Sequence, residues 1–254
     1  MTHMCGIRIA AAVLALTSSS AAGDTLFRIS LENNASHVQT RSVRRFAEAL
    51  AAKTGGELHI EVYDSGALYR DQAALAALDQ GKLEMAVPGI WQLDRMVPNL
   101  AALMLPSLFG RSTDEVHRVV DGAVGKRLNA EIEDALGVRV PGRWLDLGPI
   151  LVFGVGHSLP PDGSLDRKVI RIAAGRANEE RLKAMGARPV GIPWADLPGY
   201  IERGQLDGVL TSWETIASAD LQAKGVAVAI DVPHYFGMYV PLVSGAAWRR
   251  LSVG

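Results

Sequence analysis

The sequence contains a single cysteine, Cys5, and no excess of charge of either sign. Its 26 basic and 27 acidic residues give a formal net charge of −1, so nothing in its charge favours binding to nucleic acid or to an anionic lipid surface. Catalytic signatures are missing too, because there is no Gly-x-Ser-x-Gly, no His-Glu-x-x-His and no phosphate-binding glycine loop with a lysine. We therefore expect neither an enzyme nor a nucleic-acid-binding protein, and the sequence indicates no cofactor and no metal site.

A run of apolar residues long enough to cross a bilayer is also missing at the amino terminus. The apolar stretch 9–16 is too short for a membrane span, but it follows Arg8 and precedes a series of small residues that ends at Gly23. This order is typical of a secretory signal peptide, which we place at residues 1–23, with a buried amino-terminal helix as the alternative. Cleavage would remove Cys5 and leave a protein without thiols, as suits an oxidising periplasm.

Apolar periodicity in the first half predicts alternating strands and helices. Strands are expected at 26–31, 58–62 and 83–87, and helices at 43–50 and 71–80. A second unit of the same kind opens with the strand Val169 to Ile172 and closes with the strand Gly208 to Leu210. Two such units predict an α/β protein with two lobes and a ligand cleft between them.

The chain is expected to pass between the lobes twice. The first crossover is predicted at Leu147 to Pro149 and the return near Val226 to Asp231. These positions assign residues 24–147 and 231–254 to lobe I, and residues 148–230 to lobe II.

Arg171 interrupts the apolar strand Val169 to Ile172. A buried guanidinium is costly unless its donors meet an acceptor, and a carboxylate or phosphate fits its fork best. Because ligands of parallel sheets lie at the carboxyl ends of the strands, Arg171 is a candidate clamp for a ligand carboxylate. The alternative is an ion pair between the lobes or at the surface.

The stretch from Val169 to Gly208 resembles the solute receptors of tripartite ATP-independent periplasmic (TRAP) transporters. Those receptors share the order K-[IL]-R-[VI], a helix, G-A-x-P-[VT], an aromatic segment, a helix and G-x-[VIL]-D-G. The residues of this chain that match the four motifs are, in order, Val169 to Ile172, Gly186 to Val190, Pro193 and Trp194, and Gly204 to Gly208. The resemblance extends with few gaps from Phe27 to Trp248. It implies the two-lobe α/β fold of periplasmic binding proteins, with the ligand cleft between the lobes. It also implies that Arg171 holds a substrate carboxylate.

Seven further residues are candidate ligand contacts, because they match positions of the family pattern or lie where a predicted strand should end at the cleft. They are Glu32, Asn33, Trp91, Trp194, Thr211, Ser212 and Trp213. Each has a structural alternative: a solvated turn for Glu32 and Asn33, core packing for the tryptophans, and a helix cap for Thr211 or Ser212.

The sequence departs from the family at two places. Many receptors carry a second arginine near the first crossover, where this chain reads Gly148 to Phe153 without a cation. A monocarboxylate with hydroxyl or keto groups, such as a sugar acid or a 2-oxo acid, is therefore favoured over a dicarboxylate. Family members also continue well past Trp248 with long carboxyl-terminal helices, and because this chain stops at Gly254 we expect those helices to be missing.

The resemblance implies a periplasmic, monomeric receptor that closes over a small organic acid and delivers it to TRAP membrane permease subunits. A periplasmic sensor input or a shortened paralogue that no longer transports would have the same fold. An enzyme on this scaffold would in addition have to turn over the bound acid.

Overall fold

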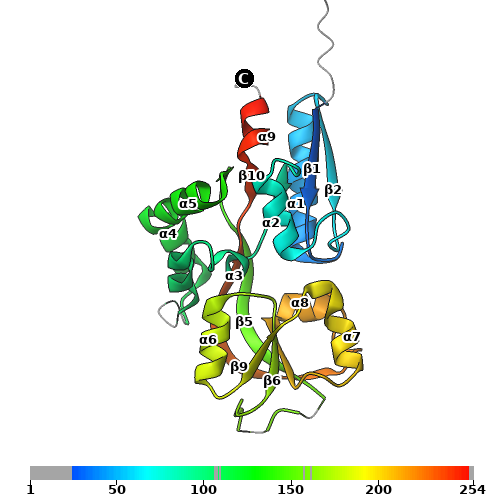
Figure 1. Cartoon of the computed structure of the whole chain (residues 1–254), viewed down its shortest axis with the longest axis vertical. Coiled ribbons are helices and arrows are strands. Elements are labelled where there is room, and N and C mark those ends of the chain that lie inside the picture. Colours follow the sequence, from blue (N-terminus) through cyan, green and yellow to red (C-terminus); the bar gives the residue numbers. More distant parts are fainter. Residues whose placement is uncertain (1–24, 106–107, 109, 157, 161, 252–254) are drawn as a thin grey trace, which may run out of the picture.

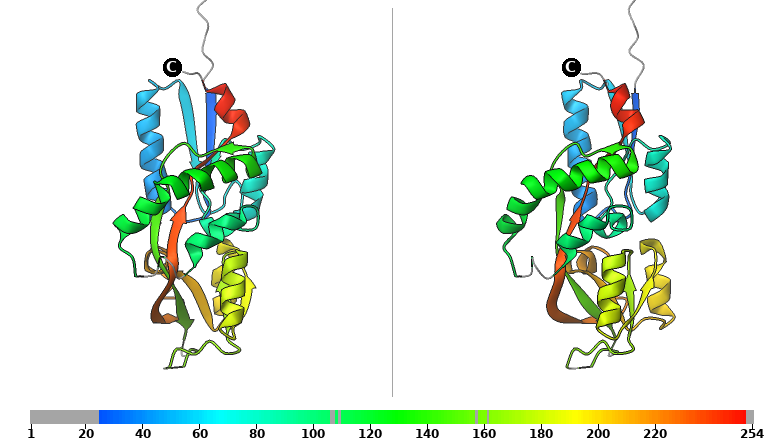
Figure 2. Two further views of the ribbon diagram at one scale, coloured as in Figure 1. Left: turned by 90° about the vertical axis from the view of Figure 1, so that its left-hand side faces the viewer. Right: turned by 60° about the vertical axis from the view of Figure 1, so that its left-hand side comes forward.

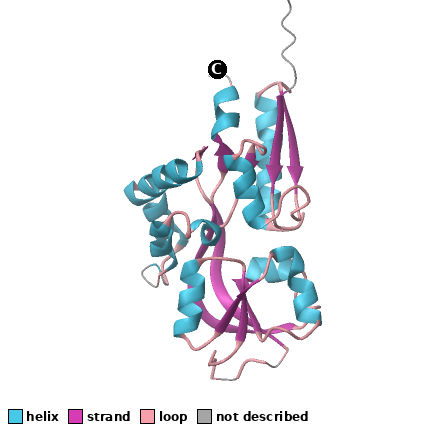
Figure 3. Ribbon diagram, in the orientation of Figure 1, coloured by secondary structure: helices cyan, strands magenta, loops and turns pink. Residues whose placement is uncertain are grey.

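Two five-stranded sheets, each with helices packed against it, form the protein (Figure 1). The computed structural model describes residues 25–105, 108, 110–156, 158–160 and 162–251. The predicted signal peptide, residues 1–23, lies outside the described residues. Figure 3 shows the strands inside each lobe with helices around them. The predicted α/β class with two lobes is confirmed.

The first lobe is organised around β1 (Thr25–Ser30), which pairs in parallel with β2 (Leu58–Tyr63) and with β3 (Met85–Ala86). The antiparallel strands β10 (Leu242–Ser244) and β4 (Val138–Arg139) complete its sheet. Its helical elements are α1 (Val38–Lys53), α2 (Asp71–Asp79), α3 (Ile90–Leu93), η1 (Pro98–Met104), α4 (Thr113–Val120), α5 (Ala123–Leu136) and α9 (Gly245–Arg250).

The second lobe has β6 (Val169–Ile172) at the centre of its parallel part, between β7 (Arg188–Gly191) and β8 (Gly208–Ser212). Strands β5 (Leu145–Val155) and β9 (Val226–Tyr239) extend this sheet with antiparallel pairing. Its helical elements are α6 (Arg176–Ala184), η3 (Trp194–Asp196), α7 (Leu197–Glu202) and α8 (Trp213–Ser218). Three of its four side chains, Ile170, Arg171 and Ile172, are buried, as expected for a parallel strand in a sheet that is covered on both faces.

The long strands β5 and β9 connect the lobes, and Figure 2 shows them running together from one lobe into the other. They pair from Val155 with Val226 to Leu145 with Tyr239, with three shifts of register along the way. The predicted first crossover lies within β5. The pairing of β9 continues to Tyr239. The strand therefore extends well past residue 231, the predicted start of the second part of lobe I.

Buried apolar side chains continue from the first lobe into the second without a break. The larger core includes Ile29 and Leu242 of the first lobe and Ile170 and Leu210 of the second. A smaller core lies in the second lobe alone and contains Leu151, Phe153, Leu197, Val209 and Ile216. In the described part of the chain, no helix is long and apolar enough to cross a membrane.

Candidate functional site

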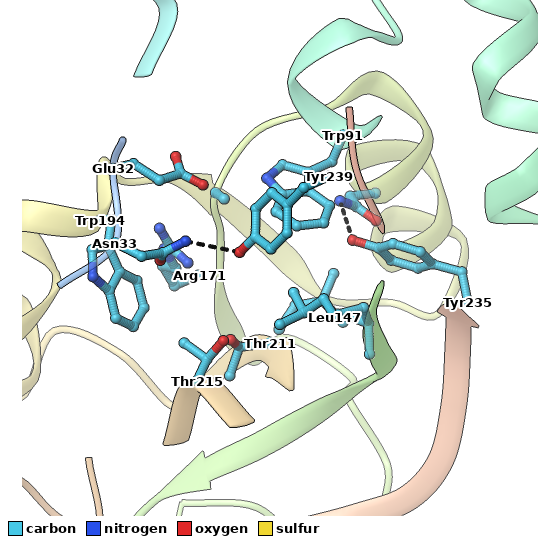
Figure 4. Close-up of a pocket in the computed structure, with 14 residues that line it drawn as sticks. Glu32, Asn33, Trp91, Leu147, Arg171, Trp194, Thr211, Thr215, Tyr235 and Tyr239 are labelled. Carbon is cyan, nitrogen blue, oxygen red and sulfur yellow. Dashed lines mark hydrogen bonds between the residues drawn. The ribbon is translucent and has the colours of Figure 1, made fainter. Parts of the chain in front are cut away.

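A small cavity of about 30 Å³ lies between the two lobes (Figure 4). Both lobes and both connecting strands contribute to its walls. The lining residues are Glu32, Asn33, Trp91, Leu147, Ile150, Arg171, Ala173, Asn178, Trp194, Leu210, Thr211, Thr215, Tyr235 and Tyr239.

Arg171 brings a buried cation to this cavity from β6, with only 2% of its surface exposed. Its Nε and Nη2 donate to the carbonyl oxygen of Ile192 at 3.0 and 2.8 Å, which fixes the direction of the guanidinium. Within the described residues no carboxylate lies within 4.0 Å of its nitrogens, and Nη1 donates to no protein acceptor. The cavity therefore contains a held cation with unused donors.

Burial lowers the pKa of Arg171 to about 10, while the nearby carboxylates of Glu32 and Asp71 act in the opposite direction. The side chain therefore keeps its charge at neutral pH. A buried charge without a close counter-ion is unfavourable by several kcal/mol. An anionic ligand beside Arg171 would relieve that cost.

Two tryptophans flank the cavity. The Trp194 ring lies under the guanidinium, with the Arg171 Cζ 5.5 Å from the ring centre. Trp91, on α3, packs edge-on against Tyr239 with ring centres 5.4 Å apart. Its buried Nε1 has no hydrogen-bond partner among the described residues. An indole nitrogen can only donate, so Trp91 offers the cavity a free donor.

Two tyrosines of β9 complete the wall opposite Trp194. The Tyr239 hydroxyl accepts from Asn33 Nδ2 at 2.9 Å, and the Tyr235 hydroxyl accepts from Asn178 Nδ2 at 3.3 Å (Figure 4). Burial raises the pKa of Tyr235 to about 12 and that of Tyr239 well above its ordinary value. Both hydroxyls therefore remain protonated at physiological pH.

Glu32 follows the carboxyl end of β1 and forms a small acidic group with Asp71. Gln92 Nε2 donates to Glu32 Oε2 at 2.7 Å and to Asp71 Oδ1 at 3.4 Å. Burial, and then the neighbouring Asp71, raise the pKa of Glu32 well above its usual value, although Arg171 works against that rise. Glu32 can therefore offer a ligand either a carboxylate oxygen or an acid proton.

Hydrogen bonds cross the cleft beside the cavity. Nε2 of His37, at the start of α1, lies 3.2 Å from the Thr215 hydroxyl of α8. His37 Nδ1 accepts from the Gln39 backbone at 3.1 Å, so Nε2 carries the proton and donates. Burial, and secondarily Arg41, lower the pKa of His37 to about 4. The neutral imidazole thus joins the two lobes.

A second contact between the lobes caps α6. Asp94 Oδ1 and Oδ2 accept from the backbone nitrogens of Arg176 and Ala177 at 3.1 and 2.9 Å. Gly175, just before the helix, has φ of 102°, and a Cβ there would lie 2.7 Å from the carbonyl oxygen of Trp91. Only glycine allows the helix to approach the first lobe this closely.

Six of the eight predicted site residues meet in this cavity, namely Glu32, Asn33, Trp91, Arg171, Trp194 and Thr211. The structure places the other two outside it. Ser212 caps α8 by accepting from the Thr215 backbone at 3.1 Å, the structural alternative considered for it. Trp213 is 55% exposed and packs edge-on against Phe153, with ring centres 4.8 Å apart. It is not among the residues that line the cavity.

Sequence reasoning missed the two tyrosines, Asn178 and Thr215. Tyr235 and Tyr239 are four residues apart, a spacing that puts two side chains on one face of a strand. This spacing is the signal that could have indicated them, because both lie on β9. For Asn178 and Thr215, both on helices, nothing local distinguishes a cavity contact from an ordinary cap.

Comparison with known proteins agrees with this architecture. The family described as "Bacterial extracellular solute-binding protein, family 7" (DctP) matches residues 29–253. The 2,3-diketo-L-gulonate-binding periplasmic protein YiaO of Escherichia coli K12 is 27% identical over 78% of this chain, and the C4-dicarboxylate-binding periplasmic protein DctP of Rhodobacter capsulatus is 26% identical over 83%. The chain spans 59% and 62% of the lengths of these relatives.

A solved TRAP periplasmic solute-binding protein from Bradyrhizobium sp. BTAi1, in complex with α/β-D-galacturonate, has the same fold. Its TM-score is 0.77 and its sequence identity 25%, and the match covers 89% of this chain and 74% of that one. The chain therefore belongs to family 7 of the bacterial extracellular solute-binding proteins, and its resemblance to the receptors of TRAP transporters is confirmed.

Proposed function

We propose that the protein is an extracytoplasmic receptor that encloses a small organic acid between its lobes and delivers it to a TRAP-type membrane permease. The observation that carries this proposal is the buried Arg171, which lines the cavity and has no carboxylate of the described chain within 4.0 Å. Its fixed guanidinium is suited to donating two parallel hydrogen bonds to a ligand carboxylate.

A monocarboxylate rich in oxygen atoms suits the cavity best. Arg171 is the single cationic side chain among the described lining residues, and the donors Trp91, Tyr235 and Tyr239 surround the remaining space. The relatives named above bind a diketo sugar acid, C4-dicarboxylates and a uronic acid. A sugar acid or a 2-oxo acid combines one anionic end with several oxygens, as this arrangement requires.

Ligand binding is proposed to act through closure of the lobes. Residues from both lobes contact the same cavity, so the full set of ligand contacts exists only when the cleft is shut. A ligand that binds the closed form better shifts the population toward it. Closure is expected to bend β5 and β9 near their shifts of register, and we propose that the lobes meet within these two strands. The permease would then distinguish closed from open receptor.

The proposed setting is the periplasm, reached through cleavage of the signal peptide at residues 1–23, and the proposed active form is a monomer. The first test is a thermal-shift screen of the mature protein against sugar acids, 2-oxo acids, hydroxy acids and dicarboxylates. A ligand that binds only the folded protein raises the unfolding temperature in a concentration-dependent manner. Stabilisation by neutral sugars or by amines, with none by any acid, would contradict the proposal.

A further inference from the structure

The hydroxyl groups of Tyr235 and Tyr239 are each reached by a chain of hydrogen bonds whose direction is fixed. The first chain begins at Arg181, whose Nη1 donates to Asn178 Oδ1 at 3.0 Å. A guanidinium can only donate, so this oxygen of the amide must accept. The Asn178 Nδ2 donates to the Ala174 carbonyl at 3.1 Å, and its remaining N–H donates to the Tyr235 hydroxyl at 3.3 Å.

Arg181 is itself held in place. Its Cζ lies 5.2 Å from the centre of the Tyr235 ring, and its Nη2 donates to the carbonyl of Met104. The orientation of the Asn178 amide is therefore set from two sides, by a donor that cannot accept and by a backbone carbonyl that cannot donate.

The second chain begins at the backbone carbonyl of Val87. It accepts from Gln39 Nε2 at 2.6 Å, which leaves Gln39 Oε1 to accept from Asn33 Nδ2 at 2.8 Å. The same Nδ2 donates its other proton to the Tyr239 hydroxyl at 2.9 Å. A carbonyl oxygen has no proton to give, so this chain also has one possible direction.

Each tyrosine oxygen thus accepts a hydrogen bond from an asparagine amide. Its own proton must point elsewhere, and within the described structure neither hydroxyl donates to a protein acceptor. Both residues line the cavity, as do the unpartnered Trp91 Nε1 and the Arg171 guanidinium. This part of the wall presents donors.

We propose that Tyr235 and Tyr239 act only as donors toward the ligand, and that they select an acid whose oxygen beside the carboxylate accepts without donating, as in a 2-oxo acid. Asn178 and Asn33 are then positioning residues, which act on the ligand through the tyrosines. The proposal rests on the function proposed above and names the class of acid. A 2-hydroxy acid also accepts, but neither tyrosine receives the proton of its hydroxyl group.

The test compares matched pairs of acids by isothermal titration calorimetry. The pairs are pyruvate with lactate, 2-oxobutanoate with 2-hydroxybutanoate, 2-oxoglutarate with 2-hydroxyglutarate, and 2-keto-D-gluconate with D-gluconate. A 2-hydroxyl turned toward the two tyrosines has no acceptor there for its proton, and an unsatisfied buried polar group costs about 1–3 kcal/mol. In that orientation the 2-oxo member of any pair that binds should be favoured by about fivefold or more.

Variants of Asn178 change the direction of the first chain. Asn178→Asp keeps the shape of the side chain but accepts from the Tyr235 hydroxyl, and Asn178→Leu leaves that hydroxyl free to accept. Both variants lose the bond to the Ala174 carbonyl, so both should lose some stability. The measured quantity is therefore the ratio of the two dissociation constants within a pair. We expect that ratio to fall toward one in both variants. When Tyr235 is already replaced by phenylalanine, adding either Asn178 variant should leave the ratio unchanged.

The outcomes separate the two proposals. If the wild type binds no acid of the panel, the receptor function itself fails. If it binds acids without preferring the 2-oxo members, or if the Asn178 variants keep the wild-type ratio, the donor-only assignment is overturned. Tyr235→Phe gives the same measurement should the Asn178 variants not fold, because removal of the donor should lower the preference.

Discussion

The guanidinium carbon of Arg171 lies 5.5 Å from the centre of the Trp194 ring, and the carbonyl of Ile192, two residues before this tryptophan, accepts from Arg171 Nε and Nη2. The short connection between β7 and η3 therefore fixes both the cation and the aromatic surface beside it. A ligand carboxylate that reaches Arg171 must lie next to the Trp194 ring. Arg171 and Trp194 therefore offer a ligand a cation and an apolar surface side by side.

Replacing Trp194 by alanine should weaken binding of the acid by about 30-fold, since a cation–π contact and an aromatic surface each contribute about 1 kcal/mol. Trp213→Ala is the matched control, because that ring packs on Phe153 outside the cavity. Calorimetric titration of both variants with the same acid checks this. A larger loss of affinity in Trp213→Ala than in Trp194→Ala would show that the ring placement is wrong.

The Asp94 cap of α6 should contribute to closure more than the exposed ion pair beside it. Asp94→Ala removes acceptors from the Arg176 and Ala177 backbones, and loss of such a cap costs about 1 kcal/mol, or about fivefold in ligand affinity. Arg95→Ala removes only the exposed bond to Glu179 at 2.7 Å, and exposed pairs contribute about 0–1 kcal/mol. Equal losses in both variants would contradict this difference.

Glu32 should make stability fall as the pH rises. Its pKa in the folded protein is raised by burial and by Asp71, so the folded state holds this proton more tightly than the unfolded state does. The resulting stabilisation is complete at acid pH and is lost as the pH rises above the ordinary glutamate value. The unfolding temperature of Glu32→Gln, measured relative to that of the wild type, should therefore increase as the pH rises from 4.5 to 7.5. The exposed Glu48→Gln is the control, and a gain that shrinks over this range would refute the assignment.

His37 should have the opposite dependence on pH. Burial and Arg41 lower its pKa from 6.5 to about 4, so the unfolded state binds the proton more tightly. Its contribution is present above pH 6.5 and is lost as the pH falls toward 4. On acidification from pH 7 to pH 4.5, the unfolding temperature of His37→Gln should fall less than that of the wild type. His59→Gln is the exposed control. If both variants follow the wild-type curve, His37 does not titrate as assigned.

Much of the fold could be predicted because apolar periodicity is a local signal. The strand containing Arg171 was found from one cation among apolar residues, and the helix that contains Val43 and Ala47 was found from its repeat. The length of β9 was not found. His234 and Pro233 interrupt its apolar pattern, and its pairing with β5 across both lobes is a property of the tertiary structure.

The cavity was predictable where strand ends supply its residues, as for Glu32, Arg171 and Thr211. Trp213 was misplaced because a residue one position past a strand can already belong to the next helix, where its direction follows the helical period. The chains of hydrogen bonds through Asn33 and Asn178 join residues far apart in the sequence. Their geometry exists only once β9 has packed beside both asparagines in the folded protein.

The central claim is that Arg171 holds the carboxylate of an organic acid. The most direct test is calorimetric titration of the best acid from the thermal-shift screen into wild type, Arg171→Met and the exposed control Arg45→Ala. Loss of a buried charge contact costs about 2–5 kcal/mol, so Arg171→Met should lose at least about 30-fold in affinity. Its ligand-free unfolding temperature should stay the same or rise, because an unpaired buried cation is gone. Binding by Arg171→Met within about threefold of wild type, a difference of less than 1 kcal/mol, would contradict the claim.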